Sequence, residues 1–267
     1  MSYTREIIAC LTRRLVVKRR LPSDFGRTQI YVAADAALGY LKPTLPGQDL
    51  FRIVREFIKP GSRVWDVGAN VGLFAFAAGR LAGPSGEVVA IEADVWLASL
   101  LLRSRDLPSN EGININIVPV AASDRNGIAR FLIAKRGRAS NTLEQSGFRS
   151  QAGGTRNMQF VPTITLDSLL DTFQPPNFLK IDVEGAEELV LSGASRVLAE
   201  HRPIIYCEVG IEQNNAVTRL LKHHNYAFLH EDNGKKTRID ACCFNTLAIP
   251  NESIEQVLDS SLSIPDE

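Results

Sequence analysis

A glycine-containing turn is the strongest chemical signal in the sequence. The residues DVGANVG occupy positions 66–72, between an apolar stretch at 63–67 that predicts a strand and one at 73–82 that predicts a helix. Gly68 and Gly72 permit a tight turn and a close approach of a ligand to the backbone. Amides exposed at the start of a helix attract a carboxylate or phosphate group. In a doubly wound α/β sheet such a turn lies at the carboxyl ends of the strands, where ligands bind.

Two nucleotide cofactors compete for this turn. A dinucleotide fingerprint counted from Gly68 requires glycine at positions where the sequence has Asn70 and Leu73. Asp66 adds a negative charge, which suits a ligand with an ammonium group better than one with two phosphates. We therefore expect S-adenosylmethionine, whose amino acid end carries such a group. An NAD-dependent oxidoreductase and a non-catalytic module that binds S-adenosylmethionine stay as alternatives.

A carboxylate follows the next predicted strand. Glu92 comes directly after the apolar residues 87–91 and is placed to accept hydrogen bonds from ribose hydroxyls, a role that both cofactors share. The alternative for Glu92 is a solvated carboxylate at a strand end. For Asp66 the alternative is a charge that stabilises the start of the following helix.

Further charged residues surround the predicted strand at 178–183. Lys180, Asp182 and Glu184 alternate along it and point to one side. Because charges inside a sheet are costly unless they are paired, we expect Lys180 to contact Asp182, Glu184 or Glu208. These three carboxylates are our catalytic candidates, with Asp182 first. A purely structural ion network is the alternative.

The chemistry that these carboxylates would serve is methyl transfer. An acceptor oxygen attacks a sulfonium methyl group better as it loses its proton, so a positioned base helps. A divalent ion at Asp182 and Glu208 stays open as an alternative to a base, and so does proximity alone, which is worth roughly 7–11 kcal/mol. No spacing of His, Cys, Asp and Glu resembles a standard metal site, so we predict no metal.

Several motifs together resemble one family, the FkbM-type methyltransferases. The motifs are DVGANVG at 66–72, IEAD at 91–94, PVAASD at 119–124, TLDSL at 165–169, KIDVEGAE at 180–187 and CEV at 207–209. KIDVEGAE is the most specific of them, and the resemblance covers about residues 48–250. It implies a class I methyltransferase fold, S-adenosylmethionine as cofactor, and methylation of hydroxyl groups on sugars, polyketides or other natural products.

The resemblance also implies roles for individual residues. The cofactor residues are Asp66, Gly68, Ala69, Asn70 and Gly72 at the methionine end, Glu92 at the ribose, and Ala122, Ser123 and Asp124 at the adenine. Asp182 and its neighbours are expected to line the place where the methyl group and the acceptor meet.

The elements that must position these residues alternate between strand and helix. Further predicted strands are 113–121, 128–134, 203–208, 226–230 and 242–249, and further helices are 50–58, 96–106, 186–200 and 212–224. The pattern predicts an α/β fold with a doubly wound, seven-stranded, mostly parallel sheet that contains one antiparallel strand. This is the Rossmann-like class I methyltransferase fold, with an N-terminal helical or hairpin extension.

Composition restricts the class of protein. The 267 residues are 45% hydrophobic, which suffices for a core and excludes disorder over most of the chain. Thirty basic residues balance thirty acidic ones, so we expect no nucleic acid partner. The four cysteines form no CxxC pair and are expected to be reduced. No apolar stretch approaches the roughly 18 residues of a membrane span, and no signal segment is evident, so we expect a cytoplasmic protein.

Three regions follow from these patterns: an N-terminal extension at 1–45, which is a candidate substrate cap, a methyltransferase domain at 46–250 and an acidic tail at 251–267. Residues 4–20 have the spacing of a basic amphipathic helix, which either packs on the main domain or lies on an anionic membrane surface. The polar stretch 139–158 is either a substrate-facing lid or a plain insertion. We expect acceptor specificity to reside in 1–45 and 139–158, while the acceptor and the oligomeric state stay undetermined.

Overall fold

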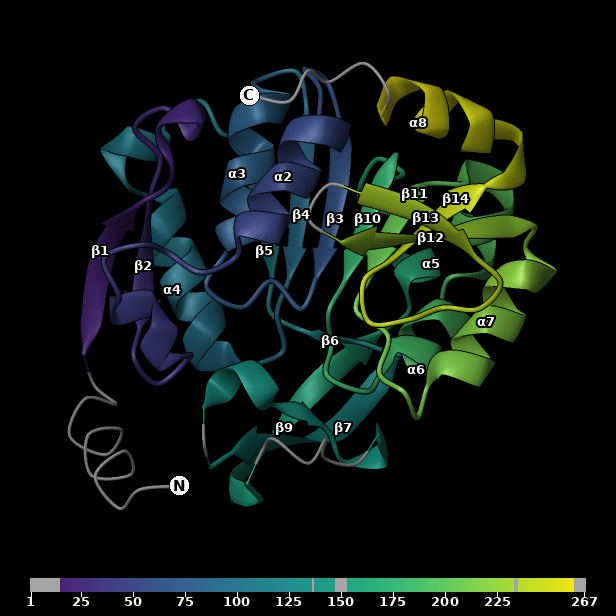
Figure 1. Ribbon diagram of the computed structural model, residues 1–267. Coiled ribbons are helices and arrows are strands. Elements are labelled where there is room, and N and C mark those ends of the chain that lie inside the picture. Colours follow the sequence, from purple (N-terminus) through teal and green to yellow (C-terminus); the bar gives the residue numbers. More distant parts are fainter. Residues whose placement is uncertain (1–14, 136, 147–152, 233–234, 262–267) are drawn as a thin grey trace.

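The computed structural model describes residues 15–135, 137–146, 153–232 and 235–261 (Figure 1). Its centre is an eight-stranded sheet with the order β13-β12-β14-β11-β10-β3-β4-β5. The strands are β3 (Arg63–Val67), β4 (Glu87–Ile91), β5 (Ile115–Val118), β10 (Phe178–Ile181), β11 (Ile204–Cys207), β12 (Tyr226–Asp232), β13 (Lys235–Ile239) and β14 (Thr246–Pro250).

The sheet confirms the expected class and corrects the strand count. Strands β5, β4, β3, β10 and β11 are parallel, and β14 pairs antiparallel with both β11 and β12. These seven strands contain the one antiparallel strand that we expected. The eighth strand, β13, pairs antiparallel with β12 at the edge. Its sequence KKTRI shows no apolar run because an exposed edge strand buries little and is protected by charge.

Helices cover both faces of this sheet. They are α2 (Gln48–Phe57), α3 (Leu73–Ala82), α4 (Val95–Arg105), α5 (Leu166–Leu169), α6 (Glu187–Ser192), α7 (Asn214–His223) and α8 (Ile254–Ser261). Successive residues of β3 point to opposite faces, so Val64 packs in the cluster with α2, α3 and α4, while Trp65 packs with α5, α6 and α7. In the predicted acidic tail, Ile254 and Val257 of α8 are buried in the first cluster.

A second sheet lies below the main one in Figure 1 and has the order β6-β9-β7-β8. Its strands are β6 (Ala121–Ala122), β7 (Gly127–Ala134), β8 (Thr142–Leu143) and β9 (Thr155–Ile164). Strand β7 confirms the extra strand expected at 128–134. The stretch 139–158, interpreted as a lid or a plain insertion, contains β8 and the start of β9. Most residues in the first half of β9 are exposed, so the alternation of buried and exposed residues that indicates a strand is absent there.

The described part of the N-terminal extension contains a hairpin of β1 (Val16–Arg20) and β2 (Gln29–Ala33). The expected helix at 4–20 is therefore wrong over 16–20, where pairing with β2 and two β-branched valines favour a strand. Residues 1–14 lie outside the described part. Strand β2 packs on α4, and the Tyr31 amide donates to Ser104 Oγ at 2.8 Å.

Short helical turns complete the architecture. They are η1 (Ser23–Phe25), η2 (Leu38–Leu41), η3 (Pro108–Asn110), η4 (Arg138–Ser140), η5 (Glu144–Ser146), the π-helical η7 (Val197–His201) and η8 (Asn251–Ser253). Among the described residues, no helix has the length and apolar character needed to cross a membrane.

Candidate functional site

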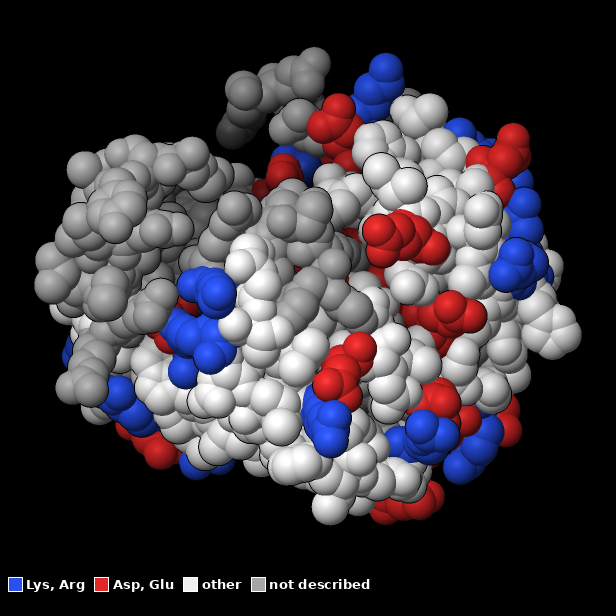
Figure 2. Space-filling model, turned by 90° about the horizontal axis from the view of Figure 1, so that it is seen from below, with Lys and Arg blue, Asp and Glu red and all other residues white. Residues whose placement is uncertain are grey.

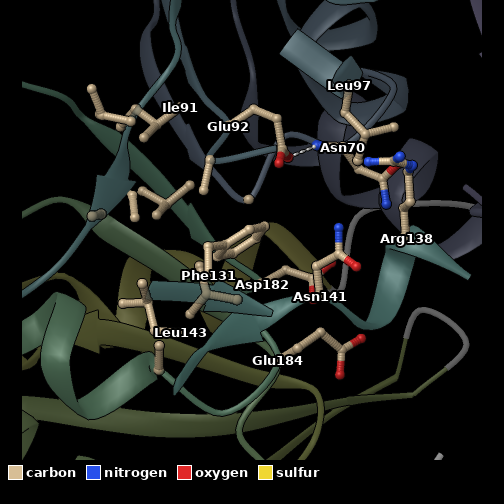
Figure 3. A pocket seen from close by; sticks show the side chains of 18 of the residues that line it. Asn70, Ile91, Glu92, Leu97, Phe131, Arg138, Asn141, Leu143, Asp182 and Glu184 are labelled. Atoms are coloured by element: carbon tan, nitrogen blue, oxygen red, sulfur yellow. Dashed lines mark hydrogen bonds between the residues drawn. The ribbon is translucent and has the colours of Figure 1, made fainter. Parts of the chain in front are cut away.

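A pocket opens at the carboxyl ends of β3, β4 and β10, and the second sheet forms its opposite wall (Figure 3). The space enclosed by the residues around it, including open solvent at its mouth, is about 580 Å³. Parallel α/β sheets bind ligands at this edge. The pocket is therefore the candidate site.

The glycine turn between β3 and α3 forms one side of the pocket. Gly68 has a φ of 79°, a left-handed conformation that glycine adopts without strain. A Cβ atom on Gly68 would lie 1.9 Å from the backbone oxygen of Asp182. At Gly72, with a φ of 88°, it would lie 2.6 Å from Leu101 and 2.7 Å from Phe76. Atoms of the protein itself thus lie too close for a side chain at either glycine, and a ligand contact of Gly68 and Gly72 stays a prediction.

The first three amides of this turn already have acceptors within the protein. Gly68 and Ala69 both donate to the Ile91 carbonyl, at 2.9 and 3.0 Å, and Asn70 donates to Glu92 Oε2 at 2.7 Å. A pyrophosphate at this turn would need such amides as donors. The NAD-dependent alternative is therefore not favoured.

The Asn70 side chain offers the opposite kind of group. Its Oδ1 atom is buried and has no hydrogen-bond partner among the described residues, and Asn70 lines the pocket. A buried unpaired acceptor is costly, so it favours a ligand that donates a hydrogen bond. The ammonium group of a bound amino acid is such a donor.

Glu92 lines the pocket and is almost fully buried, with 6% of its surface exposed. Its two carboxylate oxygens accept from the amides of Asn70, at 2.7 Å, and Asp94, at 2.8 Å. Burial raises the pKa of Glu92 to about 7, with smaller contributions from the charges of Asp94 and Asp66, although the two amides oppose the shift. Ligand hydroxyls that donate to Glu92 would stabilise its ionised form.

Lys180 neutralises the carboxylates below the turn. Its Nζ lies 3.2 Å from Asp66 Oδ1 and 3.4 Å from Asp182 Oδ2, and it donates to the Gly68 carbonyl at 3.3 Å. Burial disfavours the charged amine, but the carboxylates of Asp66, Asp182 and Glu208 outweigh it and raise the pKa of Lys180. Lys180 therefore contacts Asp182 as expected. Its second ion-pair partner is Asp66.

Six of the twelve predicted site residues line the pocket: Gly68, Asn70, Glu92, Ala122, Asp182 and Glu184. The other six do not: Asp66, Ala69, Gly72, Ser123, Asp124 and Glu208. Asp66 is fully buried and faces Lys180, and Asp124 is exposed. A direct ligand contact of Asp66 is thus not supported, because its charge is already paired inside the protein.

Sequence reasoning missed the wall that the second sheet contributes. Phe131 and Leu143 supply apolar surface, and Arg138 and Asn141 supply polar groups (Figure 3). The apolar pattern of 128–134 indicated a strand, but nothing local indicated where that strand would pack. In the described parts of the chain, no three His, Cys, Asp or Glu side chains gather as a metal site.

Comparison with known proteins identifies the family. The family model described as the methyltransferase FkbM domain matches residues 66–228, more than half of the 267 residues. The chain belongs to the FkbM methyltransferase family. It is accordingly a methyltransferase that depends on S-adenosylmethionine. None of the curated proteins compared with the chain matches it.

Solved structures resemble the chain only distantly. The FkbM methyltransferase of Methylobacillus flagellatus is 15% identical with a TM-score of 0.46, and the match covers 74% of this chain and 50% of that one. Precorrin-6y C5,15-methyltransferase of Geobacter metallireducens is 13% identical with a TM-score of 0.43, over 78% of this chain and 88% of that one. Fibrillarin of Aeropyrum pernix, crystallised with S-adenosylmethionine, is 15% identical with a TM-score of 0.40, and the match covers 89% of this chain and 83% of that one.

The residues around the pocket fit the cofactor of the FkbM family. The unpaired Asn70 Oδ1 suits the ammonium group of its methionine end, and Glu92 suits its ribose hydroxyls. Apolar side chains of Ile91, Leu97 and Phe131 line the same pocket and suit the flat adenine ring.

Proposed function

We propose that this FkbM methyltransferase transfers a methyl group to a hydroxyl oxygen of a small molecule, such as a sugar, a polyketide or another natural product. The observation that carries the proposal is the Asp182 carboxylate. It lies in the wall of the cofactor pocket, its side chain is 26% exposed, and Lys180 holds it in place. A carboxylate in this position can orient a hydroxyl group and receive its proton.

The proposed roles follow from the geometry. Asn70 Oδ1 accepts from the methionine ammonium group, Glu92 accepts from the ribose hydroxyls, and Ala122 contacts the adenine. When bound, S-adenosylmethionine supplies a methyl group on a positively charged sulfur. Asp182 would accept the proton of the acceptor hydroxyl at a carboxylate oxygen, while the hydroxyl oxygen takes the methyl carbon and the carbon–sulfur bond breaks with its electron pair left on sulfur. Lys180, buried between Asp66 and Asp182, keeps the Asp182 carboxylate oriented.

A small acceptor is favoured over nucleic acid. The chain has thirty basic and thirty acidic residues, and on the described part of the face in Figure 2 the Lys and Arg side chains lie among Asp and Glu side chains without a continuous basic surface. Nucleic acid binding depends on phosphate contacts by clustered Lys and Arg side chains.

The test is transfer of labelled methyl groups from S-adenosylmethionine to a panel of sugars, phenols, polyketide alcohols, amines and RNA. Mass spectrometry of small molecules that copurify with the protein would guide the panel. We expect an ether product on a hydroxyl group. Methylation of nitrogen, carbon or RNA would contradict the proposal, and binding of S-adenosylmethionine without turnover would favour a non-catalytic binding module.

A further inference from the structure

Three separate parts of the chain meet beside the cofactor pocket at the side chain of Arg138. Asp35 follows β2 in the N-terminal extension, Asp94 follows β4 and caps α4, and Arg138 lies in η4 of the segment that joins β7 to β8. We call Asp35, Asp94, Arg138 and Arg156 the ionic junction. The extension lies outside the stretch that matches the FkbM family model, which begins at residue 66.

The contacts of the junction are close and directional. Arg138 donates through Nε to Asp35 Oδ2 at 2.6 Å and through Nη1 to Asp94 Oδ2 at 2.5 Å. Its guanidinium group also lies over the Trp96 ring, 4.7 Å from the ring centre. Arg156 binds both oxygens of Asp35, at 2.6 and 2.8 Å. The planar guanidinium of Arg138 is therefore fixed from three sides.

The junction is largely shielded from water. The Asp94 side chain is fully buried, that of Asp35 is 9% exposed and that of Arg138 is 19% exposed. Burial works against the charge of Asp35, but Arg156 and Arg138 outweigh it and lower the pKa of Asp35. Removing one partner of such a pair leaves the other charge buried without compensation. Arg138 already serves two carboxylates, so its role is to hold structure rather than to capture an anionic substrate.

The junction is continuous with the pocket wall. The backbone amide of Asp94 donates a hydrogen bond to Glu92 Oε1 at 2.8 Å. Its side-chain Oδ2 accepts one from Asn141 Nδ2, also at 2.8 Å. Glu92, Arg138 and Asn141 all line the pocket and surround the same space in Figure 3. The backbone adds a further link, since the Arg138 amide donates to the Asp35 carbonyl at 2.8 Å.

We propose that Asp35 is a positioning residue for the adenosine end of the cofactor pocket. Through Arg138 and Asp94 it holds the loop that carries Glu92 and the wall that carries Asn141. The N-terminal extension thereby contributes to cofactor binding, a role beyond the acceptor cap suggested by its sequence. The inference rests on the proposed contact between Glu92 and the ribose.

The test measures binding of S-adenosylhomocysteine and of 5′-methylthioadenosine, which lacks the amino acid end, to Asp35→Asn by calorimetry. We expect both ligands to bind about tenfold more weakly, the effect of losing roughly one charge-assisted contact. Asp35→Glu keeps the charge and is expected to restore part of the affinity. Trp96 fluorescence should change in Asp35→Asn even without ligand, because Arg138 lies over its ring.

The matched control is Asp24→Asn. Asp24 also lies in the extension and forms an ion pair with Arg55 of α2, but neither residue lines the pocket. We expect this variant to bind both ligands as the wild type does.

Three outcomes would overturn the inference: a folded Asp35→Asn with unchanged affinity, a loss seen with S-adenosylhomocysteine alone, or an equal loss in Asp24→Asn. If Asp35→Asn does not fold, Asp35→Glu is compared with the wild type instead, and it should bind both ligands more weakly but by less than tenfold, whereas an unchanged affinity would overturn the inference. Binding needs no turnover, so a wild-type protein that binds both ligands but methylates no hydroxyl contradicts the proposed function only. A wild-type protein that binds neither ligand contradicts both.

Discussion

Glu92 carries the clearest electrostatic signature in the pocket. Its carboxylate is buried, and its pKa is raised to about 7 from an ordinary value of 4.5. The folded protein therefore holds a proton on Glu92 at pH values where the unfolded chain has released it. By linkage, this group favours folding below about pH 4.5, and its contribution is lost as the pH rises towards 7.

Ligand binding should show the opposite dependence. Ribose hydroxyls donate to the ionised carboxylate, so we expect 5′-methylthioadenosine to bind more tightly as the pH rises from about 5.5 to about 8.5, with the change centred near the Glu92 pKa of about 7. This ligand has no group of its own that titrates in that range. Calorimetry at several pH values checks the prediction, and Glu92→Gln should bind weakly with no such dependence. A pH-independent wild-type affinity would contradict the assignment of Glu92.

Asp182 and Glu208 are two catalytic candidates that differ in position. Asp182 lines the pocket and Glu208 does not. Asp182→Asn should lower turnover about 10²-fold, since it removes the proton acceptor, and should change cofactor affinity much less. Glu208→Gln is the matched control and should keep most of its turnover. Steady-state kinetics with the acceptor found in the panel checks this, and equal turnover in Asp182→Asn and the wild type would move the proton transfer elsewhere.

At the scale of elements, the glycine turn holds β3 against β10. Gly68→Ala places a methyl group against the Asp182 carbonyl, where the structure leaves 1.9 Å. Gly83 is a matched control because it also has a positive φ, 67° against 79° for Gly68, but a Cβ there meets nothing within 4 Å. Gly83→Ala should lower the free energy of unfolding by about 1–3 kcal/mol, the cost of alanine at a φ of 67° and a ψ of −171°, a conformation that almost only glycine adopts.

Gly68→Ala should cost about 3 kcal/mol more than this control, because backbone must also move. Urea denaturation of both variants measures the difference. Equal destabilisation of the two variants would show that the ends of β3 and β10 move apart at little cost. The need for glycine at position 68 would then come from its φ angle alone.

At the scale of the whole molecule, ion pairs connect α2 to the far edge of the sheet. Arg52 donates to Glu231 Oε1 of β12 through Nε, at 2.9 Å, and Nη2, at 2.7 Å, and only 1% of the Glu231 side chain is exposed. Lys236 of β13 pairs with Glu56 of α2 in the same region. These two ion pairs connect β12 and β13 to α2, the helix that precedes the glycine turn.

Arg52→Ala should therefore reduce the free energy of unfolding by about 3 kcal/mol, since it removes a partner from a buried carboxylate. Arg105→Ala is the control, because its pair with Asp106 is exposed and worth less than about 1 kcal/mol. Thermal and urea denaturation give both values. If the two variants lose the same stability, the Arg52 pair behaves as a surface contact.

Much of the main sheet was predictable because most of its strands are each indicated by a short, continuous stretch of sequence. The apolar runs at 63–67 and 87–91 and the turn between them define a strand, a helix and a strand without reference to the rest of the chain. The same is true of the carboxylates that follow these strands, so Glu92 and Asp182 were predicted at a pocket edge, which is where they lie. Their ligand contacts stay predictions.

Strands with one exposed side were harder to predict. In β9, Phe160 is 65% exposed while the next residue, Val161, is buried, so apolar residues point to both sides and the alternation that indicates a half-buried strand is blurred. Strand β13 is polar throughout for a related reason, since it lies at an edge. A hydrophobic pattern in a sequence indicates which residues are buried. These strands bury few side chains, so their patterns are weak.

The sequence by itself determined the family, seven of the eight strands of the main sheet, and the two carboxylates at its ligand-binding edge. Tertiary structure alone decided that Asp66 is paired to Lys180, that the second sheet closes the pocket, and that Asp35, Asp94 and Arg138 meet. The physical reason is distance along the chain. Residue type and local spacing fix which groups are charged or buried, but which of them become neighbours depends on how separate elements pack.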